Sequence, residues 1–398
     1  MQHVNVNRPG RGWDAMAVVS VLYLPMAALA MGPYFLDDPT LLVSQLPEGG
    51  FRLFVEGALA GRTGPYQAHL LGMVSHTLTG AMLMGLGPYL LWSRPRRRTR
   101  SHVIAGRVYL ATALASMTGA FVFLVNEPLE AAFTGPVFAL GLWAMFVGTV
   151  FSALAGWVSA LRHRIPAHIM WVCLNYGFLM SAPLLRTEWG LFGIVGVGDT
   201  LEEVSPQSAI HIVALTAGVG VIGGLHLADH LRPQARTLGA ATATGARPAP
   251  PRWTVIASVL LGGSAFAVMA GRYLDHGRLA TTHIGWYAVP VLGLVVAVVL
   301  LRRRALRRGR AALADDLLVL VCWLALSPAV AVVISAVASA WLDLEAPVAD
   351  ATGLTLCGGL AAFWAVQTLD GWSQLVDRRR KGTEAAPATH SRETARAS

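Results

Sequence analysis

The sequence predicts an all-α integral membrane protein with about ten transmembrane helices and both termini in the cytoplasm. Three observations lead to this prediction. Of the 398 residues, 55% are hydrophobic and 13% are charged, whereas an ordinary soluble domain has roughly 25% charged residues. Ten segments supply the about 20 mainly apolar residues that a helix needs to cross the hydrocarbon core. Basic clusters occur on alternate connections between these segments, as the topology of multi-pass membrane proteins requires.

The predicted spans are long apolar runs separated by polar connections. They cover residues 15–34, 67–92, 103–125, 135–161, 167–185, 209–227, 253–270, 284–301, 317–340 and 353–369. The first run follows Arg8 and Arg11 and contains Ala28-Leu29-Ala30, so it also resembles a cleavable signal peptide. We expect it to remain as an uncleaved anchor. Small residues recur at four-residue spacing in the fourth and sixth spans, which predicts close helix packing there.

The formal net charge of +9 is divided unevenly between the two sides of this topology. Arginines cluster in the connections after the second, fourth and eighth spans, and acidic residues collect in the opposite connections. Because cytoplasmic loops carry the excess of Lys and Arg, this pattern predicts cytoplasmic termini in a bacterial cytoplasmic (inner) membrane. It accounts for the basic composition without a nucleic-acid partner. The expected partner is the lipid bilayer, and the sequence indicates no oligomeric state.

Composition divides the chain into two membrane units and two polar segments. Residues 1–231 form a six-span N-terminal unit, and 253–371 form a four-span C-terminal unit. Residues 232–252 are rich in Ala, Thr, Pro and Arg and are expected to be a cytoplasmic linker. Residues 372–398 are expected to be a disordered basic cytoplasmic tail.

Histidines in the N-terminal unit are the strongest chemical signal, because imidazole can ligate heme iron or relay protons inside a membrane. The topology places His76 and His211 in the outer half of the membrane and His102 and His168 near the cytoplasmic face. Two such levels of candidate ligands are what a two-heme helical bundle requires. The alternative interpretation is that histidines near the interface cap helices or contact lipid headgroups.

Two further patterns concern metal binding and polar lining. His226 and His230 lie at i and i+4 with Asp229 nearby, which is a weak signal for a metal site. His168, Asn175 and Arg186 fall on one face of the fifth span and form a polar stripe. The stripe could line a cavity or bind heme propionates or an anion. Alternatively, Asn175 makes an interhelical hydrogen bond, and Arg186 pairs with Glu127, Glu130 or Glu188.

Spaced motifs in the same region resemble a known family. They are His76 with Leu78-Thr79-Gly80 and Gly87-Pro88, His102 with Gly106-Arg107-Val108-Tyr109, His168 with Trp171, and Leu185-Arg186. Over about residues 67–193 the chain is similar to the bacterial predicted membrane proteins of domain of unknown function DUF2306. It departs from the family pattern at Val103 and Val172. The resemblance implies the fold and marks residues, but it implies no activity.

Three functions are therefore compatible with the sequence. The first is heme b binding and transmembrane electron transfer, with a quinone or another redox partner and His76, His102, His168 and His211 as ligands. The second is a transporter or channel for a small solute, lined by the polar stripe, although the spans contain few carboxylates to couple it. The third is a sensor or assembly protein without chemistry of its own. Motifs typical of soluble enzymes, such as the Walker loop, do not occur.

Overall fold

The computed structural model describes residues 43–92, 100–129, 134–195, 201–237, 249–275 and 278–385. In these residues all regular secondary structure is helical, and nine of the helices are long and apolar enough to cross a membrane. The all-α membrane fold is therefore confirmed. The nine helices correspond to the second to tenth predicted spans, and the first predicted span, 15–34, lies outside the described residues.

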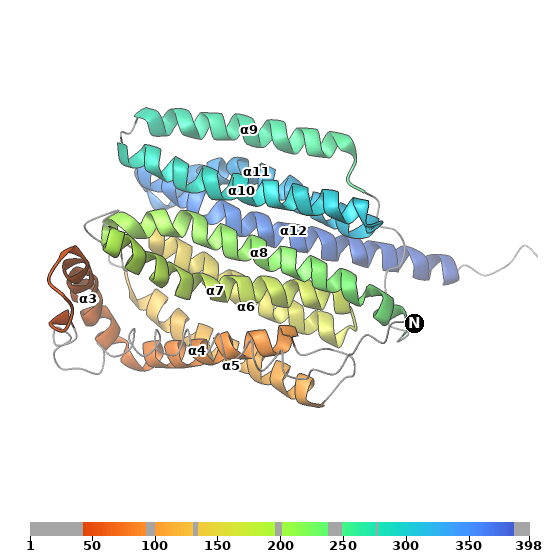
Figure 1. The fold of residues 1–398 in the computed structure, drawn as a ribbon, viewed down its shortest axis with the longest axis horizontal. Helices are drawn as coiled ribbons and strands as arrows, with labels where there is room; N and C mark the ends of the chain where they lie inside the picture. The colour runs from red at the N-terminus through yellow and green to blue at the C-terminus, as the bar shows by residue number, and fades with distance from the viewer. Residues whose placement is uncertain are drawn as a thin grey trace, which may run out of the picture.

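The helices begin and end as follows: α3 (Gly50–Ala68), α4 (Leu70–Trp92), α5 (Arg100–Asn126), α6 (Pro136–Leu161), α7 (Ile165–Val195), α8 (Leu201–Thr237), α9 (Arg252–Asp275), α10 (Arg278–Arg307), α11 (Ala311–Leu342) and α12 (Ala346–Ala385). The sequence did not predict α3, which is amphipathic because Arg52, Glu56 and Arg62 interrupt its apolar residues. It lies at one end of the bundle, beside the ends of α4, α7 and α8 (Figure 1).

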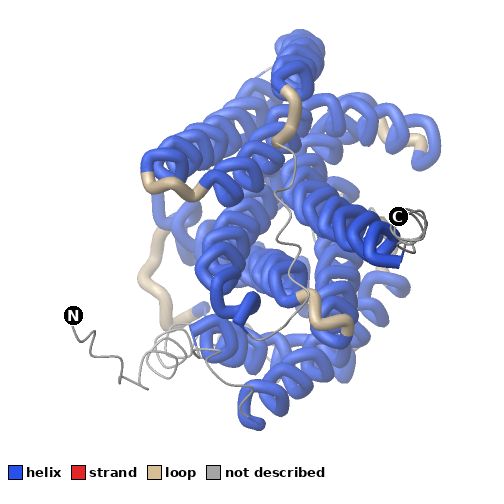
Figure 2. Tube along the Cα trace, turned by 90° about the vertical axis from the view of Figure 1, so that its right-hand side faces the viewer, coloured by secondary structure: helices blue, strands red, loops and turns tan. Residues whose placement is uncertain are grey.

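The long helices run along a common axis, with α8 and α12 inside the bundle, α4 and α5 at one edge and α9 at the other (Figures 1 and 2). The largest apolar core joins residues of α7 and α8 to residues of α10, α11 and α12, including Leu174, Val221, Leu317 and Val366. Helices on both sides of the predicted linker therefore share one core. Residues 238–248 of that linker lie outside the described residues.

Glycines allow several of these helices to touch through their backbones. A methyl group on Gly177 of α7 would lie 2.5 Å from the carbonyl oxygen of Thr216 in α8, and one on Gly220 of α8 would lie 2.6 Å from the carbonyl oxygen of Cys173. The close packing predicted from small residues is thus confirmed for α8. At Gly106 of α5, by contrast, no described atom lies within 4 Å of an added methyl group, so no such close approach occurs there.

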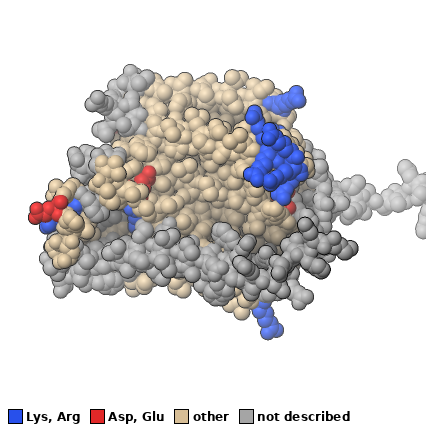
Figure 3. Space-filling view, in the orientation of Figure 1, with Lys and Arg blue, Asp and Glu red and all other residues tan. Residues whose placement is uncertain are grey.

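Charged side chains separate along the helix axis. On the face shown in Figure 3, Lys and Arg gather at the end where α10 finishes, and the acidic residues lie mainly toward the end that carries α3. The patch at the end of α10 contains the exposed residues Arg303, Arg304, Arg307 and Arg308. The predicted topology requires basic residues at one end of the helices and acidic residues at the other, which agrees with this separation. That the basic end faces the cytoplasm stays a prediction.

Helices α7, α11 and α12 extend beyond the predicted spans and carry acidic residues into the bundle; on α11 the buried residue is Asp316. Helix α7 continues to Val195 and includes Glu188, which the sequence placed in an outer connection. Helix α12 includes Asp350 and Asp370, and both are buried. The predicted spans therefore left out carboxylates that lie within these helices. Predicted boundaries stopped where the apolar runs stopped, whereas the helices continue through charged residues that have partners in neighbouring helices.

Candidate functional site

A cavity of about 190 Å³ lies among α4, α5, α6 and α7, with Tyr66 of α3 at its edge. It is found where three small apolar clusters meet, which contribute Phe123, Met117 and Phe138 among others. Its walls are mostly aromatic, Met and Leu side chains. Polar atoms of the lining come from His76, Thr77, Ser116, Thr149 and Arg186, and from the Tyr66 hydroxyl and the Trp189 indole N–H. A concave apolar site with a few convergent polar groups is typical of ligand binding.

His76 is held at this cavity by the close crossing of α4 and α5. A methyl group on Gly119 would lie 2.4 Å from the carbonyl oxygen of Gly72, so the two backbones nearly touch one turn from His76. There, Nδ1 of His76 lies 3.0 Å from the carbonyl oxygen of Ser116, and the Ser116 hydroxyl donates to the carbonyl of His76 over 3.0 Å.

This geometry favours one tautomer of the His76 ring. The Ser116 hydroxyl oxygen also lies 3.1 Å from Nδ1, and because this hydroxyl donates to the His76 carbonyl, it and the Ser116 carbonyl can both accept from a proton on Nδ1. In the neutral ring of this tautomer, Nε2 is an acceptor. Within the described residues, no hydrogen bond engages Nε2. His76 therefore offers the cavity a nitrogen lone pair.

Arg186 brings a positive charge to the same cavity. Its Nη1 donates to the carbonyl oxygen of Ala182 over 3.2 Å, and no carboxylate of the described residues lies within 4.0 Å of its guanidinium. Glu127 instead pairs with His69 at 3.5 Å, and Glu188 pairs with His211 at 2.7 Å. The alternative in which Arg186 pairs with one of these two is therefore not formed, and Glu130 lies outside the described residues.

Asn175 takes no part in the cavity lining. Its Nδ2 donates to the carbonyl oxygen of Thr149 over 2.7 Å and to Ser152 Oγ over 3.0 Å. Its Oδ1 accepts from the Tyr109 hydroxyl over 2.7 Å. Asn175 therefore joins α5, α6 and α7 through interhelical hydrogen bonds, which was the alternative interpretation of this residue in the polar stripe. His168 is also outside the cavity lining, so the three residues of the stripe do not line one cavity.

The histidines of the predicted inner level remain near one another. Nδ1 of His168 lies 2.8 Å from the carbonyl oxygen of Gly156, which leaves its Nε2 as an acceptor in the neutral ring. His102 is close enough to His168 for their charges to interact. The structure therefore brings His102 and His168 into one region at the start of α5 and α7.

The predicted outer pair of His76 and His211 is not brought to one site. His211 does not line the cavity, and both of its ring nitrogens are engaged. Nδ1 lies 2.9 Å from the carbonyl oxygen of Gln207, Nε2 lies 2.7 Å from Oε1 of Glu188, and the ring stacks on Trp286. In this arrangement His211 has no nitrogen left for heme iron.

The residues of the weak metal site are also placed by the structure. Nδ1 of His226 lies 3.0 Å from the carbonyl oxygen of its own helix at Ile222, and His230 is exposed. Asp229 pairs with Arg310 at 3.5 Å. Across the described segments, no group of three or more His, Cys, Asp or Glu side chains is arranged to hold a metal ion.

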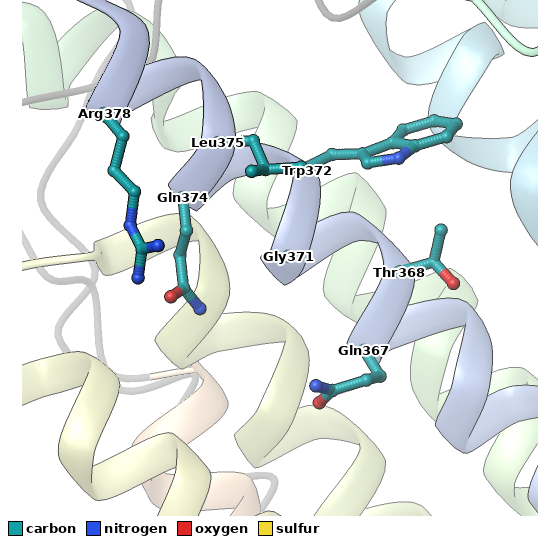
Figure 4. A pocket seen from close by; sticks show the side chains of 7 residues that line it. All are labelled: Gln367, Thr368, Gly371, Trp372, Gln374, Leu375 and Arg378. Atoms are coloured by element: carbon teal, nitrogen blue, oxygen red, sulfur yellow. The ribbon is translucent and has the colours of Figure 1, made fainter. Parts of the chain in front are cut away.

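A second hollow lies on the surface of α12. It measures about 320 Å³ and is lined by Gln367, Thr368, Gly371, Trp372, Gln374, Leu375 and Arg378, all from this one helix (Figure 4). Thr368 accepts a hydrogen bond from Nε1 of Trp323 over 3.0 Å. Because one helix forms the whole lining, we regard this hollow as an open groove rather than a binding site.

Sequence reasoning missed the residues that support the site. Ser116 and Gly119 were not singled out, although they hold His76, because neither belongs to a motif that carries chemistry. Trp286 was not expected beside His211, since nothing in the sequence states that α10 packs on α8. The sequence pointed to His76 and Arg186 themselves, because both are polar residues within the motifs that resemble the family.

Comparison with known proteins supports the membrane fold and marks this region. No curated protein and no solved structure matched the chain. A family model did match, described as predicted membrane protein (DUF2306), and the match extends beyond the region expected from the motifs. Residues 73–236, which run from α4 to the end of α8 and include His76, Ser116 and Arg186, are thus similar to the DUF2306 family of predicted membrane proteins.

Proposed function

We propose that the protein binds a lipophilic carboxylate, drawn from the bilayer, in the cavity among α4, α5, α6 and α7. The observation that carries this proposal is Arg186, a cation without a carboxylate partner among the described residues, in an otherwise apolar cavity. Arg186 is half-buried, and a charge that is partly removed from water is costly unless an opposite charge accompanies it. A bound anion would supply that charge.

The chemistry of the lining favours a carboxylate over other anions. A guanidinium presents parallel donors that match the two oxygens of a carboxylate. Met73, Met84 and Phe123 offer an adaptable apolar surface to a hydrocarbon chain.

The size of the cavity limits the part of the ligand that it encloses. About 190 Å³ corresponds to about six water molecules at roughly 30 Å³ each. The head group and a short hydrocarbon stretch fit this space, and the remainder of a longer chain would lie between helices or in lipid. Binding of this kind serves a transporter or a sensor equally, and both are among the alternatives that the sequence leaves open.

The test compares octanoate with 1-octanol, which share a chain length and differ in charge. We expect wild-type protein in detergent to bind octanoate and Arg186→Gln to bind it at least about tenfold more weakly, the factor equivalent to 1.4 kcal/mol. The exposed Arg107→Gln is the matched control and should bind octanoate as the wild type does. Octanol should not distinguish the three proteins. Equal octanoate affinity in the wild type and Arg186→Gln would overturn the proposal.

Heme b is the second candidate, and one observation favours it. His76 and His168 each bind a backbone carbonyl through Nδ1, the arrangement that orients Nε2 toward a metal in many metal-ligating histidines. Arg186 would suit a propionate. The cavity at His76 is nevertheless below the roughly 300 Å³ at which small-molecule pockets begin, so heme would require the helices to separate.

A visible spectrum decides between the two ligands. Protein purified from cells supplied with a heme precursor should give sharp reduced-minus-oxidised b-type bands if heme is bound, and His76→Ala should remove part of them. Absence of these bands in protein that binds octanoate would leave the carboxylate proposal alone.

A further inference from the structure

A buried pair of ionisable side chains, Glu188 and His211, lies beside the cavity but outside its lining. Their side chains are 16% and 5% exposed, and Nε2 of His211 lies 2.7 Å from Oε1 of Glu188. Trp286 of α10 stacks on the imidazole with ring centroids 5.1 Å apart, and Trp286 also contacts Phe192. Oε2 of Glu188 is buried and has no hydrogen-bond partner among the described residues.

The hydrogen bonds of His211 indicate that this pair holds a proton. The carbonyl oxygen of Gln207 lies 2.9 Å from Nδ1 and can only accept, so this contact favours a proton on Nδ1. The contact between Nε2 and Oε1 then also needs a proton. That proton lies either on Nε2, giving imidazolium beside carboxylate, or on Glu188, giving a carboxylic acid beside neutral imidazole. Either form is neutral overall, and loss of the proton leaves a net charge of −1.

We propose that Glu188 and His211 form a proton-binding dyad whose bound proton favours anion binding in the adjacent cavity. The coupling rests on the proposed carboxylate binding at Arg186. Glu188 adjoins the cavity through its neighbours on α7, because Leu185 and Trp189 both line it. A deprotonated dyad and a bound carboxylate would place two negative charges at the same end of α7 in a medium of low dielectric constant. Proton and carboxylate therefore bind together more strongly than separately, and by linkage each raises the affinity for the other.

The ionisable groups around the dyad come from several helices. Helix α6, which packs on α7 and α8, carries no ionisable side chain. On α10, His283 makes an edge contact with Tyr273. Among the described side chains toward this end of the bundle, on α3, α7, α10 and α12, are Arg52, Glu56, Arg186, His283 and Asp350. Helix α8 also begins with Glu202 and Glu203, and α3 contains Arg62, but these side chains lie outside the description. Asp350 already pairs with Arg272 and accepts from Ser335.

The first experiment tests the proton site without any ligand. Infrared difference spectra of the wild type across a pH step should show a carboxyl band that shifts in D2O and is lost in Glu188→Gln. Glu127→Gln, which alters the pair of Glu127 with His69, is the matched control and should retain the band. If Glu188→Gln does not fold, nitrogen-15 NMR of histidine-labelled wild type should show one imidazole whose Nδ1 stays protonated while its Nε2 proton titrates. A spectrum without either signal would overturn the dyad.

The second experiment tests the coupling with octanoate over about pH 6 to 9, where that probe stays ionised. We expect wild-type affinity to fall at least about fivefold as pH rises, the lower limit of typical coupling energies. Glu188→Gln should bind octanoate with an affinity that pH does not change. A pH-independent affinity in the wild type would overturn the coupling, whereas absence of octanoate binding with an intact infrared signal would overturn the proposed function alone.

Discussion

Nε1 of Trp171 in α7 donates a 3.1 Å hydrogen bond to Oδ2 of Asp370 in α12, 199 residues later in the chain. Oδ1 of the same carboxylate accepts from Arg164, and the two charged side chains are 16% and 8% exposed. Trp171 is one of the motif residues of the DUF2306-like region, and Asp370 lies outside the segment that matches the family model. The family-like region is thus tied to the C-terminal helix by a buried polar contact.

Removing the charge of Asp370 should destabilise the protein more than removing an exposed carboxylate. In Asp370→Asn, Arg164 keeps a largely buried charge without its partner, which costs about 3–5 kcal/mol. Thermal unfolding in detergent should show a clear fall in the midpoint. The exposed Glu345→Gln should unfold like the wild type, and Arg164→Met combined with Asp370→Asn should recover part of the loss. Equal midpoints for Asp370→Asn and Glu345→Gln would contradict this account.

Gly119→Ala should separate α4 from α5 and disturb His76. Its methyl group would lie 2.4 Å from the carbonyl oxygen of Gly72, and overpacking of this kind costs about 1–3 kcal/mol. We expect a lower unfolding midpoint and weaker octanoate binding. Gly106→Ala is the matched control because its methyl group meets nothing within 4 Å, and its higher helix propensity is worth up to about 1 kcal/mol. The prediction fails if both variants behave alike.

The hydrogen bond from Tyr109 to Asn175 should contribute a modest coupling energy. A double-mutant cycle with Tyr109→Phe and Asn175→Leu should give about 0.6 kcal/mol, the average measured for hydrogen bonds between membrane helices. Tyr176→Phe is the control, because the Tyr176 hydroxyl donates to the Met84 carbonyl instead. The cycle can be read from unfolding in detergent. A coupling energy of zero would contradict this prediction, because it would mean that other interactions fully replace the hydrogen bond between Tyr109 and Asn175.

The basic end of the bundle should face the cytoplasm. The native residues Cys173, Cys322 and Cys357 are buried, so an impermeant maleimide should leave them unlabelled in intact cells. A cysteine at Arg308, which is exposed at the basic end, should label after the membrane is opened. A cysteine at Glu345, exposed at the opposite end, should label in intact cells. The reverse pattern would invert the predicted topology.

The long apolar runs made the spanning helices predictable, because about 20 apolar residues have few other solutions. Helix α3 was not found, since Arg52 and Glu56 break its apolar run. His76 and Arg186 were recognised from their motifs. Their presence in one cavity was not predictable, because it depends on the crossing of α4 and α5 at Gly72 and on how α7 is oriented.

The polar stripe shows why helical periodicity alone was insufficient. Asn175 and Arg186 lie at nearly the same angle on an ideal helix, yet Asn175 binds neighbouring helices and only Arg186 lines the cavity. Pro183 lies between them in α7 and removes a backbone donor there. The roles of Glu188 and His211 were missed for a similar reason, since their pairing requires α7 and α8 to be placed side by side.

The shared core has a consequence for the order in which the protein matures. Synthesis inserts α7 and α8 well before α12, yet Leu174 and Val221 complete their packing against residues of α12 such as Val366. Arg164 and Trp171 likewise gain their carboxylate partner when α12 arrives. During translation the family-like helices must therefore wait in the bilayer with an unfinished surface.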